Sequence, residues 1–164
     1  MNLSKNFSKA ELCKSQTAIR MGLNNNPTDD QTENLRLLCE RVLQPVRDHF
    51  NQVVTISSGF RDPVLSRKIG SSEKSQHCRG EAADLEIFGV ANNELADWIK
   101  ENLMFDQLIL EHHVPGEPNS GWVHVSYTKE INSNRKEYLM ATRNASGKTE
   151  YKQILGLSTD RYVK

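Results

Sequence analysis

The sequence lacks a charge excess of either sign. Its 164 residues include 21 lysines and arginines and 21 aspartates and glutamates, so the formal net charge at pH 7 is zero. A protein that binds nucleic acid mainly through phosphate contacts needs a local excess of Lys and Arg. Here these residues are scattered, and aromatic residues make up only 7% of the chain. We therefore expect no nucleic-acid partner.

Long apolar runs are also absent. No stretch approaches the roughly 18 apolar residues of a membrane span, and the first thirty residues contain no apolar block that resembles a signal peptide. We therefore expect no membrane span, and synthesis in the cytoplasm without a signal peptide. The length favours a single domain over residues 1–164, and we expect this domain to be a monomer.

Cysteine is sparse as well. Cys13, Cys39 and Cys78 are odd in number and widely spaced, and no C-x-x-C pair is present. This excludes the usual spacing of a structural zinc knuckle or a dithiol redox site. Free thiols in a reducing compartment are the expected state.

Local patterns predict helices in the first third of the chain. A capping box at Ser8 and Glu11 begins a first helix that runs to about Met21, where Gly22 ends it. A second helix follows, and Pro45 within it should kink or shorten it. Its apolar face is made by residues at three- and four-residue steps, namely Leu35, Leu38, Val42 and Val46.

The rest of the chain predicts mainly strands. β-Branched residues indicate a strand at 53–57, before a turn and a short helix opened by Pro63. Residues 82–87 alternate, so a second strand has one apolar face and one face with carboxylates. We therefore expect an α+β domain with a run of antiparallel strands. The remaining predicted elements are a helix capped by Asn93, strands at 105–111 and 122–127, and a hairpin of strands at 137–142 and 148–154.

Three residues stand out as candidate metal ligands: His77, Asp84 and His124. Two imidazoles and one carboxylate form a three-ligand zinc set that leaves a fourth position open for water, which is typical of a hydrolytic site. A histidine on a strand is also a common structural residue, and a His–Asp spacing of seven arises often by chance. Spacing alone therefore leaves both interpretations open.

The wider pattern around these residues resembles a known family. Residues 75–84 match S-x-H-x-x-G-x-A-x-D at every fixed position, as in the zinc D-alanyl-D-alanine carboxypeptidases and related phage endolysins, which have the hedgehog-like peptidase fold. The stretches 58–63, 105–109 and 122–126 are also similar to that family. The resemblance covers roughly residues 7 to 143. It implies an antiparallel sheet with helices packed on one side.

The resemblance also implies roles for individual residues. His77, Asp84 and His124 would bind Zn²⁺, and Arg61 would orient the substrate or stabilise the oxyanion. The planar guanidinium of Arg61 suits a peptide carbonyl or a terminal carboxylate. Without the family context, the simpler interpretation is a surface arginine paired with Asp62 or Glu86.

The general base is where the sequence departs from part of the family. Several relatives have an acidic residue three positions before the last ligand, where this chain has Gly121. Our candidate is Glu111. If Glu111 lies opposite Trp122 in an antiparallel pair, Ile109 faces His124 and Glu111 lies diagonal to that histidine, about 7 to 8 Å away. The simpler interpretation is a strand-end glutamate in solvent, and the substitutes for the role are His112, His113 and Glu117.

Neighbours of the candidate site have structural interpretations. Cys78 should point away from the metal, as a small buried residue. Trp122 could stack on substrate, but packing is favoured. Gly80 and Ala82 are small, which lets the loop approach the metal and turn His77 back towards Asp84. We interpret Asp106 and Gln107 as structural.

Together these features predict zinc-dependent hydrolysis of a peptide bond in peptidoglycan stem or cross-link peptides, of the D,D-carboxypeptidase or endopeptidase type. A phage or prophage lysis protein that acts on the cell wall after release or delivery would fit. The alternative is a catalytically inactive zinc-binding or structural module of a phage particle that retains the fold.

Overall fold

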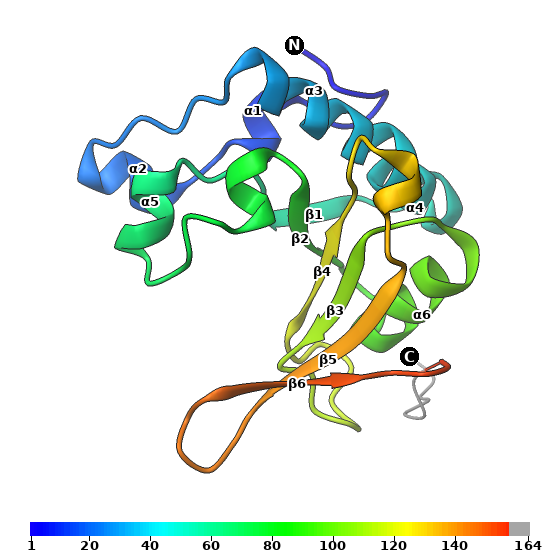
Figure 1. The fold of residues 1–164 in the computed structure, drawn as a ribbon. Coiled ribbons are helices and arrows are strands. Elements are labelled where there is room, and N and C mark those ends of the chain that lie inside the picture. Colours follow the sequence, from blue (N-terminus) through cyan, green and yellow to red (C-terminus); the bar gives the residue numbers. More distant parts are fainter. Residues whose placement is uncertain (158–164) are drawn as a thin grey trace.

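A computed structural model describes residues 1–157 of the chain, shown in Figure 1. Residues 158–164 of the predicted domain lie outside the described part. The helices are α1 (Lys9–Leu12), α2 (Gln16–Met21), α3 (Asp29–Leu38), the π-helix η1 (Cys39–Leu43), α4 (Gln44–Phe50), α5 (Pro63–Lys68), the 3₁₀-helix η2 (Gln76–Arg79), α6 (Asn92–Asn102) and the 3₁₀-helix η3 (Ile131–Ser133). The strands are β1 (Val54–Ser58), β2 (Ala82–Ile87), β3 (Gln107–Glu111), β4 (Trp122–Ser126), β5 (Glu137–Arg143) and β6 (Thr149–Gln153).

The expected first helix is divided in two. The Ser8 hydroxyl accepts a hydrogen bond from the Glu11 backbone N–H at 3.1 Å, as predicted, but α1 ends after one turn. Ser15 then caps α2 by accepting from the Ala18 N–H at 3.1 Å. A single helix to Met21 is therefore wrong, because a second capping serine favours a new start over continuation. Gly22 ends α2 in the left-handed conformation, as expected.

The apolar face predicted for the second helical segment, which comprises α3, η1 and α4, is confirmed. Leu35, Leu38, Val42 and Val46 have no exposed surface. Pro45 lies near the start of α4, directly after η1. There the Gln44 N–H bonds to the Cys39 carbonyl, five residues back. Because proline has no N–H and crowds the preceding turn, a locally widened turn is its expected effect on a helix.

The sheet has six strands in the order β1-β2-β4-β3-β5-β6. Four of its five pairings are antiparallel, but β3 and β5 are parallel, so the expectation of an antiparallel sheet is wrong at this pair. The reason lies in the connection after β4. The Lys136 and Glu137 N–H groups bond to the Phe105 and Asp106 carbonyls, which places the start of β5 beside the start of β3. The α+β class and the β5–β6 hairpin are as predicted.

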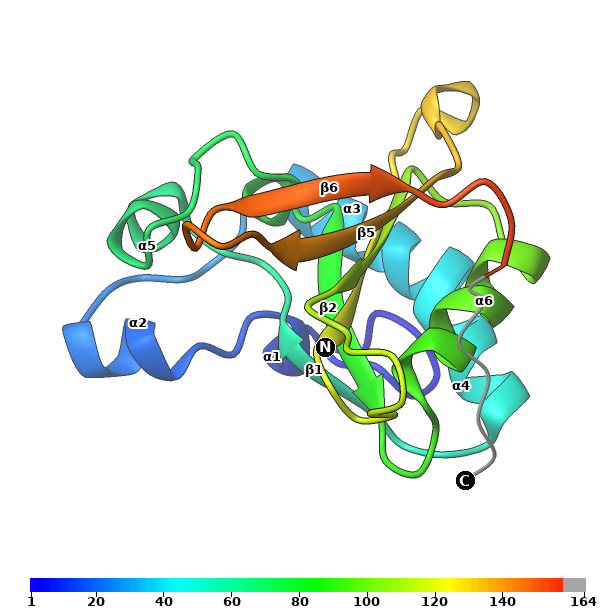
Figure 2. The same cartoon turned by 90° about the horizontal axis from the view of Figure 1, so that it is seen from below.

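Helices cover one face of this sheet, the core face. Ala83, Leu85 and Ile87 of β2 point to this face and share one apolar core with side chains of α3, η1 and α6. In both views α4 and α6 lie on this side, whereas α2, α5 and the tip of the β5–β6 hairpin lie on the other (Figures 1 and 2). The helices that pack into the core therefore lie on one side of the sheet, as expected, and the short helices α2 and α5 flank the opposite face. No helix in the described part is long and apolar enough to cross a membrane.

The start of α6 differs from expectation. Ala91, not Asn93, is its N-cap, and no side chain caps it. Asn92 instead bonds outward through its amide to the carbonyls of Ser120 and Gly121, at 3.0 and 3.1 Å. The helix start is therefore tied to the loop before β4.

Candidate metal centre

His77 is held on the short helix η2. The Ser75 hydroxyl accepts from the His77 backbone N–H at 3.2 Å, and Gly80 ends the helix in the left-handed conformation. On the imidazole, Nδ1 lies 2.7 Å from the Gly59 carbonyl oxygen. If Nδ1 donates to this carbonyl, Nε2 is left unprotonated and free to bind a metal. This is the usual second-sphere arrangement of a metal-binding histidine.

Two glycines let the surrounding backbone pack closely around His77. A Cβ at Gly59 would lie 2.2 Å from the Leu12 carbonyl oxygen, and one at Gly80 would lie 2.4 Å from the Gln31 carbonyl oxygen. The small residue at 80 was expected to allow close approach to the metal. The close neighbour is instead the first turn of α3, so these contacts fix the loop to the N-terminal helices.

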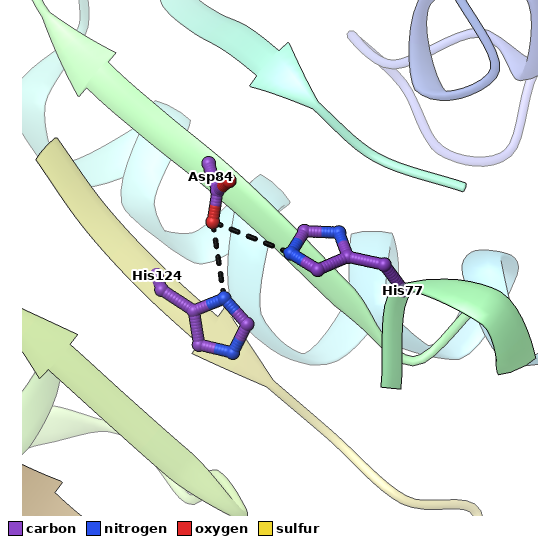
Figure 3. Close-up of side chains that lie close together, drawn as sticks. All are labelled: His77, Asp84 and His124. Atoms are coloured by element: carbon purple, nitrogen blue, oxygen red, sulfur yellow. Dashed lines mark hydrogen bonds and ion pairs between the residues drawn. The ribbon is translucent and has the colours of Figure 1, made fainter. Parts of the chain in front are cut away.

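Asp84 and His124 come from neighbouring strands. They are directly opposite each other in the β2–β4 pair, on the sheet face that the core helices leave uncovered. Asp84 Oδ1 lies 3.0 Å from His124 Nδ1 and 3.4 Å from His77 Nε2. Figure 3 shows both rings directed at this single carboxylate. The three predicted residues are therefore brought together by one strand pair and one loop.

These side chains fit a metal ion. One ligand atom from each of His77, Asp84 and His124 lies within 4.8 Å of the others. Two imidazole nitrogens and one carboxylate oxygen are ligands that Zn²⁺ accepts, and three protein ligands leave a position for water or substrate. Cys78 is not in the cluster, and its thiol faces the Ser72 carbonyl. Its predicted orientation away from the metal is confirmed.

The charge states suit metal binding. Burial lowers the pKa of the His77 imidazole, against the opposing effect of the Asp84 carboxylate. Burial alone would raise the pKa of Asp84, but the interactions with the His124 and His77 imidazoles outweigh it and hold this pKa well below its usual range. A neutral imidazole beside an ionised carboxylate is the form that a divalent cation requires.

Glu111 lies beside this cluster. The structure has the register that was assumed from the sequence, since Ile109 pairs with His124 and Glu111 with Trp122. Glu111 also lines a cavity of about 410 Å³, the site cavity, together with the three candidate ligands. Burial raises the pKa of the Glu111 carboxyl, and the charge of Asp84 raises it further, against the opposing effect of His124. The side chain is therefore not simply in solvent.

The substitutes for the base lie elsewhere. Among the described residues that line the site cavity, His112, His113 and Glu117 do not occur. His113 is buried with Nδ1 3.3 Å from the Ser120 carbonyl, and Glu117 is exposed in a turn. His112 has a φ of 53° and packs at 5.3 Å against the Trp122 ring. Packing is thus one role of Trp122, although the ring also lines the cavity.

Gly121 cannot carry the acidic side chain found in some relatives. Its φ is +66°, and a Cβ there would lie 1.9 Å from the Glu111 carbonyl oxygen. The backbone of residue 121 thus lies against the backbone of residue 111. In this chain the position three residues before His124 supports the Glu111 strand end and has no room for a side chain of its own.

Arg61 lies at the rim of the cluster. It lines the site cavity, and its backbone N–H bonds to the His77 carbonyl at 3.1 Å. In the described part of the chain its buried Nε has no hydrogen-bond partner, and it forms no ion pair with Asp62 or Glu86. The surface ion pair considered from sequence is therefore absent in the described part of the chain, and the guanidinium of Arg61 borders the site cavity without an ion-pair partner there.

Sequence reasoning missed several residues around the site. Gln76 and Tyr151 also line the cavity, as does Gln107, whose amide bonds to Glu137 at 2.8 Å. The alternation in β6 puts Tyr151 on the face that Glu111 occupies, through Ala141 between them. That register depends on the parallel β3–β5 pair, which local patterns did not predict.

A buried carboxylate supports the His77 loop from behind. Asp106 accepts from the Gln76 amide at 2.9 Å and from Arg135 Nε at 3.0 Å. Burial would raise the pKa of Asp106, but the bonds from Arg135 and Gln76 hold it below its usual value. The structural role predicted for Asp106 is confirmed, and its contact with the residue before His77 adds a positioning role.

Comparison with known proteins agrees with this geometry. A family model described as Peptidase M15 matches residues 5–126, which is well over half of the chain. The match contains all three candidate ligands, Arg61 and Glu111, and ends before β5. No curated protein matches the chain.

Proposed function

This chain belongs to the Peptidase M15 family, and from that premise we propose that it is a zinc-dependent hydrolase of peptide bonds in bacterial peptidoglycan. Membership indicates a metallopeptidase with a peptide substrate. The observation that carries the proposal is the convergence of His77, Asp84 and His124 within 4.8 Å in a cavity that also holds Glu111. The motif at 75–84 supports stem or cross-link peptides as substrate, with a carboxypeptidase or endopeptidase of the phage endolysin type as the form of the enzyme.

We assign the metal site to His77, Asp84 and His124. When bound, zinc would lower the pKa of a coordinated water to about 7 and polarise the carbonyl of the scissile peptide. His77 is oriented by the Gly59 carbonyl, and His124 and Asp84 are fixed by strand pairing. The ligands are therefore organised before a metal binds, which reduces the entropy lost on binding.

Glu111 is our general base. Its carboxylate lies on the same face as His124, two residue pairs along the strands, and burial raises its pKa above the usual value, which makes it a stronger base. Glu111 would take the proton from the attacking water and return it to the leaving amine. General acid–base catalysis of this kind contributes about 10²- to 10⁴-fold to the rate.

Arg61 is our second catalytic residue. Its guanidinium borders the site cavity with a buried N–H that has no partner within the described residues. An unpaired buried donor is costly unless a ligand satisfies it. The oxygen of the scissile carbonyl, which gains negative charge as water adds, is a suitable acceptor.

A second candidate function is a zinc-binding module without turnover. It is favoured by Gly121, because the acidic residue of some relatives is missing there and a side chain cannot be accommodated. Such a module would bind zinc and peptide but release no product. Hydrolysis therefore separates the two candidates, whereas metal content does not.

The test begins with bound metal, measured by mass spectrometry on protein purified without a metal-affinity tag. We expect about one zinc per chain in the wild type and none in His77→Ala or His124→Ala. His49→Ala is the matched control, because His49 stacks on Trp98 away from the site, and should keep its zinc. No zinc in the wild type, even after refolding with zinc, would contradict the proposal.

The second step is a muropeptide digest. Wild type should hydrolyse peptides, and Glu111→Gln should keep zinc but lose about 10²- to 10⁴-fold in rate. Glu111→Gln with unchanged rate would remove Glu111 as the base. Zinc without hydrolysis of any muropeptide in the wild type would favour the binding module.

A further inference from the structure

Two cavities meet at the metal centre. The site cavity of about 410 Å³ lies over β4 and β3 and reaches Tyr151 on β6. A second cavity of about 490 Å³ lies over β1, between α2 and α5. Arg61 and Asp84 line both of them. The candidate metal centre therefore has a cavity on each of two sides.

The strand order arranges these cavities in a line. From β1, which borders the second cavity, the sheet runs through β2 and β4, which carry Asp84 and His124, to β3, then β5 and finally β6. Neighbouring strands are about 4.8 Å apart, so β1 and β6 are separated by roughly 20 Å or more. An extended peptide rises about 3.3 Å per residue. A peptide that crosses the sheet from β1 to β6 would therefore have about six residues, and the candidate metal ligands would lie under its middle, not under its end.

The two sides differ in chemistry. The second cavity is lined by the apolar side chains of Ile56, Phe60 and Leu65 together with polar residues, among them Lys14. The site cavity instead offers the amides of Gln76 and Gln107 and the phenol of Tyr151. Each side thus has groups that contact a peptide, with an apolar side chain favoured over β1 and polar groups favoured over β3 and β6.

The position of Arg61 bears on whether the enzyme removes a terminal residue or cleaves an internal peptide bond. An enzyme that removes the last residue of a chain needs a cation that binds the terminal carboxylate at a closed end of the site. Arg61 lines both cavities and therefore lies between them, not at the far end of either one, and among the described residues the one other Lys or Arg that lines either cavity is Lys14. A chain that passes Arg61 has room to continue on both sides.

We propose that the enzyme is an endopeptidase. It binds at least two substrate residues on each side of the scissile bond, and the residues on the two sides occupy different cavities. The inference rests on the proposed function and goes further by naming the substrate as an internal peptide bond. One water is consumed per bond. The carbonyl side leaves as a carboxylate and the nitrogen side as an amine, and each fragment keeps two or more residues.

The first experiment compares products. Zinc-loaded wild type is incubated with cross-linked muropeptide dimers, with pentapeptide monomers, and with the same monomers amidated at the C-terminus, and products are identified by mass spectrometry. We expect internal cleavage into fragments of two or more residues, with amidated and free peptides cut at rates within about threefold. Release of single terminal amino acids, lost on amidation, would overturn the inference while leaving the hydrolase proposal intact.

The second experiment uses binding and does not depend on turnover. The full-length Glu111→Gln protein is titrated with an uncleaved pentapeptide amide and followed by amide chemical shifts. Shifts should appear around both Lys14 and Tyr151. Shifts at one of the two only, or at neither, would contradict a peptide path across both cavities, whether or not any muropeptide is hydrolysed.

Variants at the two ends complete the test. Lys14→Ala and Tyr151→Ala should each raise KM or weaken pentapeptide binding by about threefold or more, with zinc content unchanged. Lys5→Ala is the control for Lys14, and Lys152→Ala is the control for Tyr151 because it lies next to it on β6 and is exposed. If only one of the two variants differs from its control, the path does not extend to both ends.

Discussion

The two faces of strand β2 are stabilised by different kinds of interaction. Leu85 points to the core face, has no exposed surface and packs with the helices. Asp84, the preceding residue, points to the opposite face and is held by two imidazoles. The core face is stabilised by many weak and interchangeable contacts. The site face depends on a few directional hydrogen bonds, so stability and chemistry are separated by one residue along the chain.

The same contrast holds for the segments that serve each face. Side chains of α3 and α6 reach the core through apolar stripes, in which volume matters more than identity. His77 reaches the site only because the Gly59 carbonyl, the Ser75 hydroxyl and the left-handed Gly80 each fix its position. Substitutions on the core face should therefore change mainly the free energy of unfolding, whereas substitutions on the site face should change mainly zinc affinity.

The largest expected effect is on metal affinity. Asp84→Asn removes the carboxylate that both histidines face, so zinc affinity should fall by more than the roughly 100-fold that loss of an outer-shell partner costs. Competition with a chelating dye measures this. The neighbouring Leu85→Ala should keep one zinc per chain. Equal loss of zinc in both variants would mean that the faces are not independent.

The next effect is on the backbone behind Glu111. Gly121→Ala should cost about 3 kcal/mol or more of unfolding free energy, because overpacking against the Glu111 carbonyl adds to the cost of a left-handed φ. Gly22→Ala is the matched control, with a φ of +63° and no atom near the added Cβ, and should cost about 1 to 2 kcal/mol. Urea denaturation that gives equal costs would contradict the close approach.

On the core face, Leu85→Ala should cost about 3 kcal/mol of unfolding free energy, from lost burial and the cavity left behind. Leu155→Ala is the control, since Leu155 is 89% exposed, and should stay within about 0.5 kcal/mol of wild type. Both are measured by urea denaturation of the metal-free protein. A Leu85→Ala cost below about 1 kcal/mol would show that this face is loosely packed.

The smallest effect concerns the support behind His77. Asp106→Asn should cost about 1 to 2 kcal/mol at pH 7, because the carboxylate accepts from Arg135 and Gln76. The folded pKa of Asp106 is below its usual value. Its contribution is therefore full above the unfolded pKa of about 3.9 and is lost as pH falls through the folded pKa. The gap between wild type and variant should thus close in acid, and a gap that is constant with pH would contradict this role.

Much of the architecture was predictable because it depends on local pattern. The alternation in residues 82–87 predicted β2 and the face that Asp84 occupies, and the spacing from Leu35 to Val46 predicted a buried helical face. The end of α1 after one turn, the start of α6 and the parallel β3–β5 pair were not predicted. The first and the last of these depend on a second capping serine and on a connection that returns to the start of β3.

For the site, the sequence by itself determined the residue types: His77 and Asp84 in a family motif, His124 in a second similar stretch, and Glu111, whose place beside His124 followed from an assumed strand register. Only the tertiary structure decided which neighbours complete it. It excluded a side chain at Gly121, left Arg61 without its surface ion pair, and brought Tyr151 into the cavity through Ala141. The physical reason is that strand alternation and helix spacing are local properties of the chain, whereas close backbone approach and non-local strand pairing arise only when distant segments pack.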